Sequence, residues 1–166
     1  MNALWSYFWP AFAAGLLIGA VGGLIAFRRR KKRNVVLAAG FVATLALAAL
    51  WHGPLGGADR FTVLVERTAR QVLDVYEMPK VTARLHHGPL SRRLVLAGPA
   101  DAFQTAELVR LMSAVPGVSR AQWSASPAGP PLILEGAGAA LMGFLLGLLL
   151  AYLVELRRRY NAQWNW

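Results

Sequence analysis

Three stretches of this sequence are apolar and almost free of charge: residues 4–27, 35–51 and 132–156. The first is about 24 residues long and the second about 17, and a helix needs about 20 apolar residues to cross the hydrocarbon core of a bilayer. We therefore predict three membrane-spanning helices, over residues 1–27, 35–52 and 132–156.

Two runs of cations lie beside these stretches. One fills a predicted loop over residues 28–34, and the other opens a predicted tail over residues 157–166. Cytoplasmic loops carry an excess of Lys and Arg, and both runs fall inside when the N-terminus is outside and the C-terminus is inside. The residues that set this topology are Arg28, Arg29, Arg30, Lys31, Lys32, Arg33, Arg157, Arg158 and Arg159.

The beginning of the chain does not have the pattern of a cleavable signal peptide, because no cation precedes Phe27. We expect this first span to remain in the mature protein. Trp5, Tyr7, Phe8 and Trp9 are typical of an aromatic anchor at the external membrane interface.

Residues 58–130 have the pattern of a small external domain. Apolar positions at three- and four-residue spacing predict an amphipathic helix over residues 60–77. Two β-rich runs, 81–86 and 90–97, are joined by a turn signal, which predicts a hairpin. Asp101 and Gln104 have the spacing of a capping box and open a second helix with Phe103 and Met112 on its apolar face. Residues 118–123 then predict a third strand, so the order is α-β-β-α-β.

Two short motifs in this segment resemble the BON domain, a small α/β module of bacterial envelope proteins. The run Leu94-Val95-Leu96-Ala97-Gly98 is similar to that family's apolar strand ending in glycine, and Val115-Pro116-Gly117-Val118 is similar to its turn into the last strand. The resemblance covers about 60 residues and departs from the family at Pro99. It implies a periplasmic, non-catalytic domain on a protein of the bacterial inner membrane, which binds phospholipids or other envelope proteins.

The net charge of +10 follows from this topology. Nine of the 18 Lys and Arg residues lie in the two cytoplasmic runs, and the other nine face six acids in the external segment. The exposed domain therefore has only a modest cationic excess, which argues against a nucleic-acid partner. With zero cysteines, disulfides and thiolate metal sites are excluded.

Three histidines are the candidate ligands. His86 and His87 are adjacent on a predicted strand, so their side chains point to opposite faces and cannot readily grip one metal ion. Ala48 and His52 have a spacing that resembles the pigment-ligating element of bacterial antenna helices. Gly53 and Pro54 end that helix at once, so we favour an interfacial polar cap for His52 over a cofactor ligand, with bound lipid or pigment at the helices as the remaining cofactor options.

Small residues recur every four positions along two of the spans, in the pattern that lets membrane helices approach closely. The two stripes contain Gly15, Gly19 and Gly23 in the first span and Ala139, Gly143 and Gly147 in the third. They serve equally well for packing within the chain or against a partner subunit.

The pattern as a whole indicates a three-span α-helical membrane protein with a BON-like α+β periplasmic domain. Nothing in it resembles a nucleophile with a base and an orienting acid, so we expect no enzyme activity. The preferred hypothesis is an accessory or scaffold subunit of a photosynthetic or respiratory membrane complex, whose partners are other integral membrane proteins. The alternative is an envelope phospholipid-binding or stress-response protein.

Overall fold

The computed structural model describes residues 2–28, 30–123 and 129–163, so Arg29 of the first basic run lies outside the described residues. The chain forms two compact units that both draw on distant parts of the sequence. The sheet unit comprises Met1–Tyr7 and Gly56–Glu135, and the helical unit comprises Phe8–Leu55 and Gly136–Trp166.

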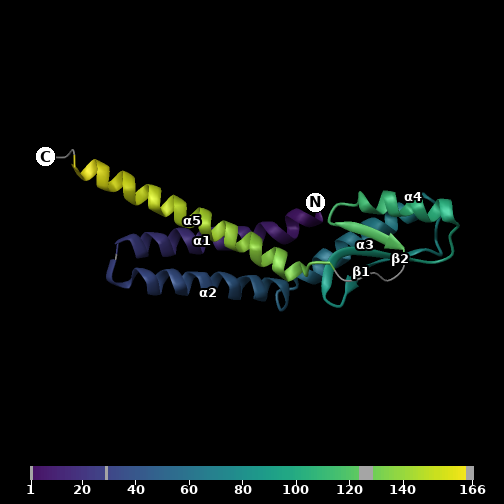
Figure 1. The fold of residues 1–166 in the computed structure, drawn as a ribbon, viewed down its shortest axis with the longest axis horizontal. Coiled ribbons are helices and arrows are strands. Elements are labelled where there is room, and N and C mark those ends of the chain that lie inside the picture. The colour runs from purple at the N-terminus through teal and green to yellow at the C-terminus, as the bar shows by residue number, and fades with distance from the viewer. Residues whose placement is uncertain (1, 29, 124–128, 164–166) are drawn as a thin grey trace. The chain divides into compact units, whose positions relative to one another are not determined.

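Three helices in the described residues are long and apolar enough to cross a membrane, so three helices of the predicted kind are present at the predicted places. Figure 1 shows their course. They are α1 (Ala3–Arg28), α2 (Arg33–His52) and α5 (Leu132–Gln163), and a short 3-10 helix, η1 (Arg30–Lys32), precedes α2. Helix α5 continues past the predicted end of the span at residue 156. The second basic cluster of the chain, Arg157–Arg159, therefore lies within α5.

The small-residue stripes of α1 and α5 lie against each other within the helical unit. A Cβ atom added at Gly19 would overlap the carbonyl oxygen of Phe144, and one added at Gly147 would overlap that of Leu16. Gly15 and Gly143 lie equally close to backbone oxygens of the facing helix. In this structure the stripes therefore serve packing within the chain, because only glycine leaves room for backbones at this distance.

Ala139, a member of the predicted stripe in α5, does not lie at the centre of this contact. Ala140 lies against Gly15 and is buried, whereas Ala139 is half-buried beside this contact. At 3.6 residues per turn, a strict four-residue repeat drifts around the helix, and seven residues make nearly two turns. Ala140, seven residues before Gly147, is therefore in line with the stripe.

The sheet unit has the predicted order of elements, with a three-stranded sheet in the order β1-β2-β3. Its elements are α3 (Gly57–Val75), β1 (Thr82–His87), β2 (Leu90–Ala97), α4 (Ala102–Ser113) and β3 (Arg120–Trp123). Strand β2 pairs antiparallel with β1 and parallel with β3. Helix α4 supplies the crossover between β2 and β3 that a parallel pair requires.

One face of the sheet carries the core. Leu85, Leu94 and Ala121 are paired across the three strands and are all buried. Helix α3 contributes Phe61, Val65, Ala69 and Leu73, which follow one another every four residues along a single face. Leu108 and Met112 of α4 complete this layer, whereas Phe103 is 80% exposed and does not lie on the buried face, contrary to the prediction. Helix geometry explains the difference, because at 3.6 residues per turn the spacing between Phe103 and Met112 is two and a half turns, which puts Phe103 on the opposite side of α4.

Turn chemistry fixes the ends of these elements. The side chain of Asp101 accepts a hydrogen bond from Gln104 N at 2.7 Å, and Gln104 Oε1 accepts one from Asp101 N at 3.1 Å. The predicted capping box is thereby confirmed. Gly98 ends β2 with a φ of +144°, where a Cβ would lie 2.7 Å from Lys80 O. Glycine is required there on both grounds.

Candidate functional site

The first turns of α1 and α5 complete the core of the sheet unit. Tyr7 is 1% exposed, and its ring centroid lies 5.6 Å from that of Phe61. Its hydroxyl donates a long hydrogen bond of 3.5 Å to Leu132 O, and Leu132 itself is fully buried. Tyr7 was predicted to be part of an interfacial aromatic anchor; the structure places it inside the sheet unit.

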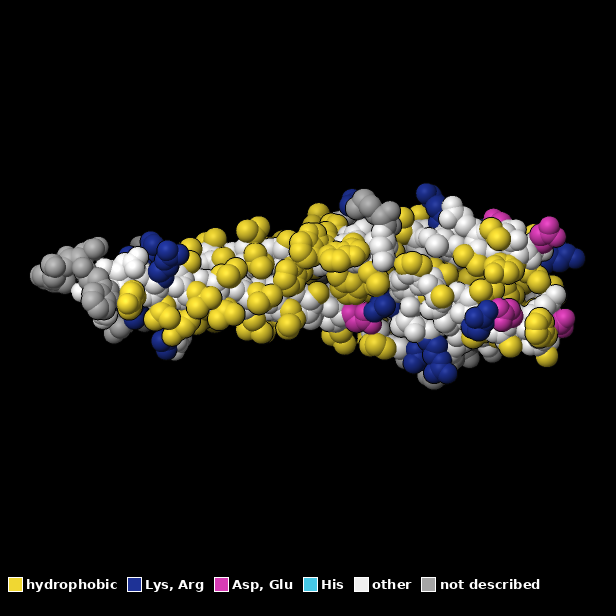
Figure 2. Space-filling view, turned by 90° about the horizontal axis from the view of Figure 1, so that it is seen from above, with side chains coloured by type: hydrophobic (Ala, Val, Ile, Leu, Met, Phe, Trp, Pro, Cys, Tyr) yellow, Lys and Arg dark blue, Asp and Glu magenta, His cyan; other side chains and the backbone are white. Residues whose placement is uncertain are grey.

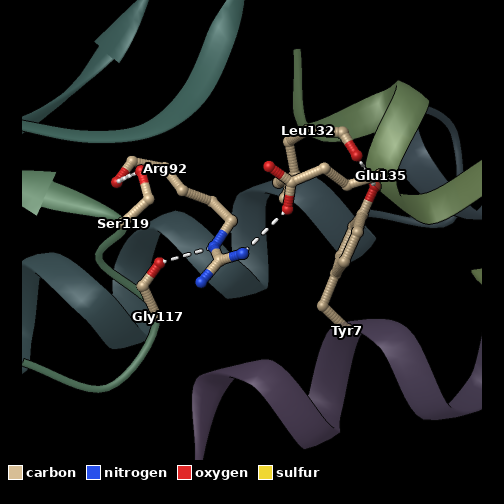
Figure 3. A network of polar contacts seen from close by, with 6 residues as sticks. All are labelled: Tyr7, Arg92, Gly117, Ser119, Leu132 and Glu135. Carbon is tan, nitrogen blue, oxygen red and sulfur yellow. Dashed lines mark hydrogen bonds and ion pairs between the residues drawn. The ribbon is translucent and has the colours of Figure 1, made fainter. Parts of the chain in front are cut away.

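A polar network beside Tyr7 joins three parts of this unit (Figure 3). Arg92 on β2 donates from Nε to Gly117 O at 3.0 Å and from Nη1 to Glu135 Oε2 at 2.9 Å. Ser119 donates from both N and Oγ to Arg92 O, at 2.8 and 3.1 Å. Through these two bonds, the guanidinium of Arg92 fixes the turn before β3 and the first turn of α5 against strand β2. Charged hydrogen bonds between partly buried groups have the strength needed for such positioning.

An apolar groove lies between the C-terminal ends of α3 and α4 and has a volume of about 430 Å³. Its walls are Val72, Val75 and Tyr76 on one side and Leu111 and Pro116 on the other. Val75 is 78% exposed at its edge. None of the described residues that line the groove is charged. On the exposed side of α4, the hydrogen bond from Arg110 lowers the pKa of the Glu107 carboxyl.

The face of the sheet opposite the core carries three arginines. The register places Arg93 on β2 directly opposite Arg120 on β3. Arg84 on β1 pairs with Val95, which is two residues after Arg93 on β2 and so points to the same face. Since side chains alternate along a strand, these arginines share a face. Arg84 and Arg120 are exposed, and Arg93 is half-buried beneath Gly129. This surface has the charge to meet an anionic group.

The structure does not bring the candidate histidines together. His86 shares a hydrogen bond of 3.2 Å between its Nδ1 and Pro89 O, whereas His87 Nε2 lies 3.7 Å from Glu66 Oε1. The described residues contain no group of three or more His, Asp or Glu that could hold a metal ion.

His52 is the last residue of α2 and is half-buried. Ala48, which the antenna resemblance would leave beside a pigment, is 6% exposed and packs with Ala11 and Ala140. The space next to Ala48 is therefore filled by side chains of α1 and α5.

Sequence reasoning missed both the groove and the Arg92 network. The groove depends on where two helices end next to each other, and no local pattern encodes this. Glu135 did carry a signal, because an acid in the first turn of an apolar helix needs a partner. Comparisons with protein-family models, curated proteins and solved structures gave no match for this chain.

Proposed function

We propose that this protein is a non-enzymatic accessory subunit of a larger membrane complex, and that the groove between α3 and α4 binds an apolar segment of another protein in that complex. The observation that carries the proposal is the groove itself: an apolar hollow without charged lining, formed by the half-buried Val72 and Leu111 and the exposed Val75, on a unit that has its own buried core. Exposed apolar surface of this kind is typical of interaction sites.

The chemistry of the groove favours a protein over a lipid headgroup as its occupant. A phosphate needs cations or aligned N–H donors, and the described lining offers Thr68 and Gln71 as its main polar side chains. Aliphatic anchors of a partner helix or strand would instead meet Val72, Val75 and Leu111. Burying such anchors gives about 25 cal/mol for each Å² of apolar surface removed from water.

A BON-like character of the sheet unit is part of this proposal, and it rests on the two motifs Leu94-Val95-Leu96-Ala97-Gly98 and Val115-Pro116-Gly117-Val118. With that resemblance we propose that the unit lies in the periplasm and the three helices in the bacterial inner membrane. A photosynthetic or respiratory complex is the class of assembly we propose, since such complexes contain small subunits without catalytic residues of their own.

A charge placed in the groove is expected to release the partner. In Val75→Asp, a carboxylate would have to be desolvated when an apolar segment binds, while the fold is spared because the side chain is exposed. We expect this variant to lose co-migrating proteins on native gels after gentle detergent extraction. Val63→Asp is the matched control, because Val63 lies on the same helix, is 53% exposed and is not part of the groove lining. Equal co-migration of the two variants would contradict the proposed partner site.

The proposed orientation can be tested by thiol labelling, because the chain has no cysteine of its own. Phe103→Cys places a thiol at an 80% exposed position of the sheet unit, and Asn161→Cys places one on the last exposed turn of α5. In spheroplasts, a membrane-impermeant maleimide should label the first and not the second. Labelling of Asn161→Cys alone would reverse the proposed orientation.

A second candidate function is phospholipid binding by the sheet unit, and the arginine face of the sheet favours it. Arg84, Arg93 and Arg120 would meet lipid phosphates there. The groove experiment also separates the two candidates. If the unit binds lipid through this face, Val75→Asp leaves every interaction of the protein unchanged.

A further inference from the structure

A pocket of about 260 Å³ lies at the basic end of the helical unit, wholly among residues of that unit. Its apolar part is formed by Ala26, Phe27 and Leu156, and its polar part by Arg33, Glu155 and Arg159. Phe27 and Tyr152 meet edge to face beside it, with ring centroids 5.9 Å apart. The pocket therefore combines a hydrocarbon floor with a cationic rim.

Glu155 pairs with Arg159 of this rim and with the neighbouring Arg158. Its side chain is only 7% exposed. It accepts a hydrogen bond from Arg159 Nε at 3.0 Å and forms an ion pair with Arg158, whose Nε lies 3.2 Å away. Both arginines are thus held by their inner nitrogens. Within the described residues, the structure gives the outer nitrogens of Arg159 no further acceptor.

The rim keeps a positive charge after this pairing. One carboxylate faces two guanidinium groups, and the structure gives Arg33 no carboxylate partner among the described residues. Arg28, Lys31, Lys32 and Arg157 are also exposed at this end. Figure 2 shows Lys and Arg side chains gathered there, while hydrophobic side chains cover the surface of the helices.

We propose that this pocket binds the headgroup of an anionic phospholipid. The phosphate would lie between Arg33 and the outer nitrogens of Arg159, and the glycerol and upper acyl carbons would lie on Phe27 and Leu156. A volume below the roughly 300–1,000 Å³ of drug-sized ligand sites suits a headgroup and not a whole lipid. Basic pockets between membrane helices on the cytoplasmic side recognise such headgroups. This inference does not depend on the partner proposed for the sheet unit.

The test uses the full chain purified in detergent and mixed with phosphatidylglycerol or with phosphatidylcholine, with bound lipid counted by native mass spectrometry. We expect retention of phosphatidylglycerol alone, and a several-fold loss of it in Arg33→Gln and in Arg33→Gln/Arg159→Gln. The matched control is Lys31→Gln/Arg157→Gln, which removes the same charge from exposed positions outside the pocket and should retain the lipid.

Three outcomes would overturn the proposal. Equal loss in the pocket and control variants would show general attraction of anions to a basic surface. Unchanged retention in Arg33→Gln/Arg159→Gln would place the lipid elsewhere, including on the arginines of the sheet. Displacement of phosphatidylglycerol by inorganic phosphate alone would show a site for a free anion, because a lipid that also rests on Phe27 and Leu156 should resist it. Arg33→Gln alone keeps the Glu155 pairs, so a folding defect of the double variant does not mask the result.

Discussion

Replacing Tyr7 with alanine is expected to lower the free energy of unfolding of the sheet unit by about 3–5 kcal/mol, the usual cost of removing a buried aromatic side chain. The variant loses the ring contact with Phe61 and leaves a cavity beside Leu132. The hydroxyl contributes much less, because its hydrogen bond to Leu132 O is 3.5 Å long. Tyr7→Phe should therefore cost about 1 kcal/mol or less.

Hydrogen exchange measured by mass spectrometry can follow this effect in the full chain, through the amides of β2. Tyr7→Ala should expose them far more often than the wild type, whereas Tyr7→Phe should resemble the wild type. Trp5→Ala is the control, since Trp5 is an aromatic residue in the same turn and is 61% exposed. If Trp5→Ala and Tyr7→Ala weakened protection equally, the first turn of α1 would not be part of the core of the sheet unit.

A single methyl group added to a contact glycine of either α1 or α5 should destabilise the helical unit by about 1–3 kcal/mol, as overpacking does in other cores. In Gly19→Ala the new Cβ overlaps a backbone oxygen of Phe144, and in Gly147→Ala it overlaps that of Leu16. Neither neighbour is a flexible side chain, so the two helices must move apart. This separation weakens the contacts between the two helices along the whole length of the small-residue stripes.

The same helices supply the controls. Gly22 and Gly138 have no described heavy atom within 4 Å of an added Cβ. Helix propensity favours alanine at such positions by up to about 1 kcal/mol. Thermal denaturation in detergent, followed by circular dichroism, should show a lower midpoint for Gly19→Ala and Gly147→Ala but not for Gly22→Ala or Gly138→Ala. Similar midpoints for all four would mean that the stripes do not pack against each other in the membrane.

Local patterns predicted the elements of this chain well. Uninterrupted apolar runs predicted the three long helices, and the spacing of Asp101 and Gln104 predicted the start of α4. These features depend on residues that are neighbours in the sequence, so periodicity and capping chemistry are enough to find them.

Contacts between distant residues were not predictable in the same way. Tyr7 stands among other aromatics at the start of an apolar helix, and this setting is typical of an interfacial anchor. Its burial depends on Phe61 and on Leu132, which is 125 residues away. A weak signal was present, because Ala3, Tyr7 and Ala11 are spaced by four and are all buried. Nothing local distinguishes that spacing from the rest of an apolar helix.

The discontinuous make-up of the sheet unit has a consequence for synthesis. A ribosome makes Met1–Tyr7 first and Leu132–Glu135 only after every strand of the sheet, yet both segments belong to this unit. Closing a separation of 125 residues costs chain entropy before the contact is gained. A nascent chain that stops before residue 132 therefore leaves Tyr7 without its partner on α5 and Arg92 without its carboxylate. A protease that acts on unfinished chains would therefore meet an incomplete core of the sheet unit in every chain that ends before residue 132. It would meet a complete core only in chains that already contain the first turn of α5.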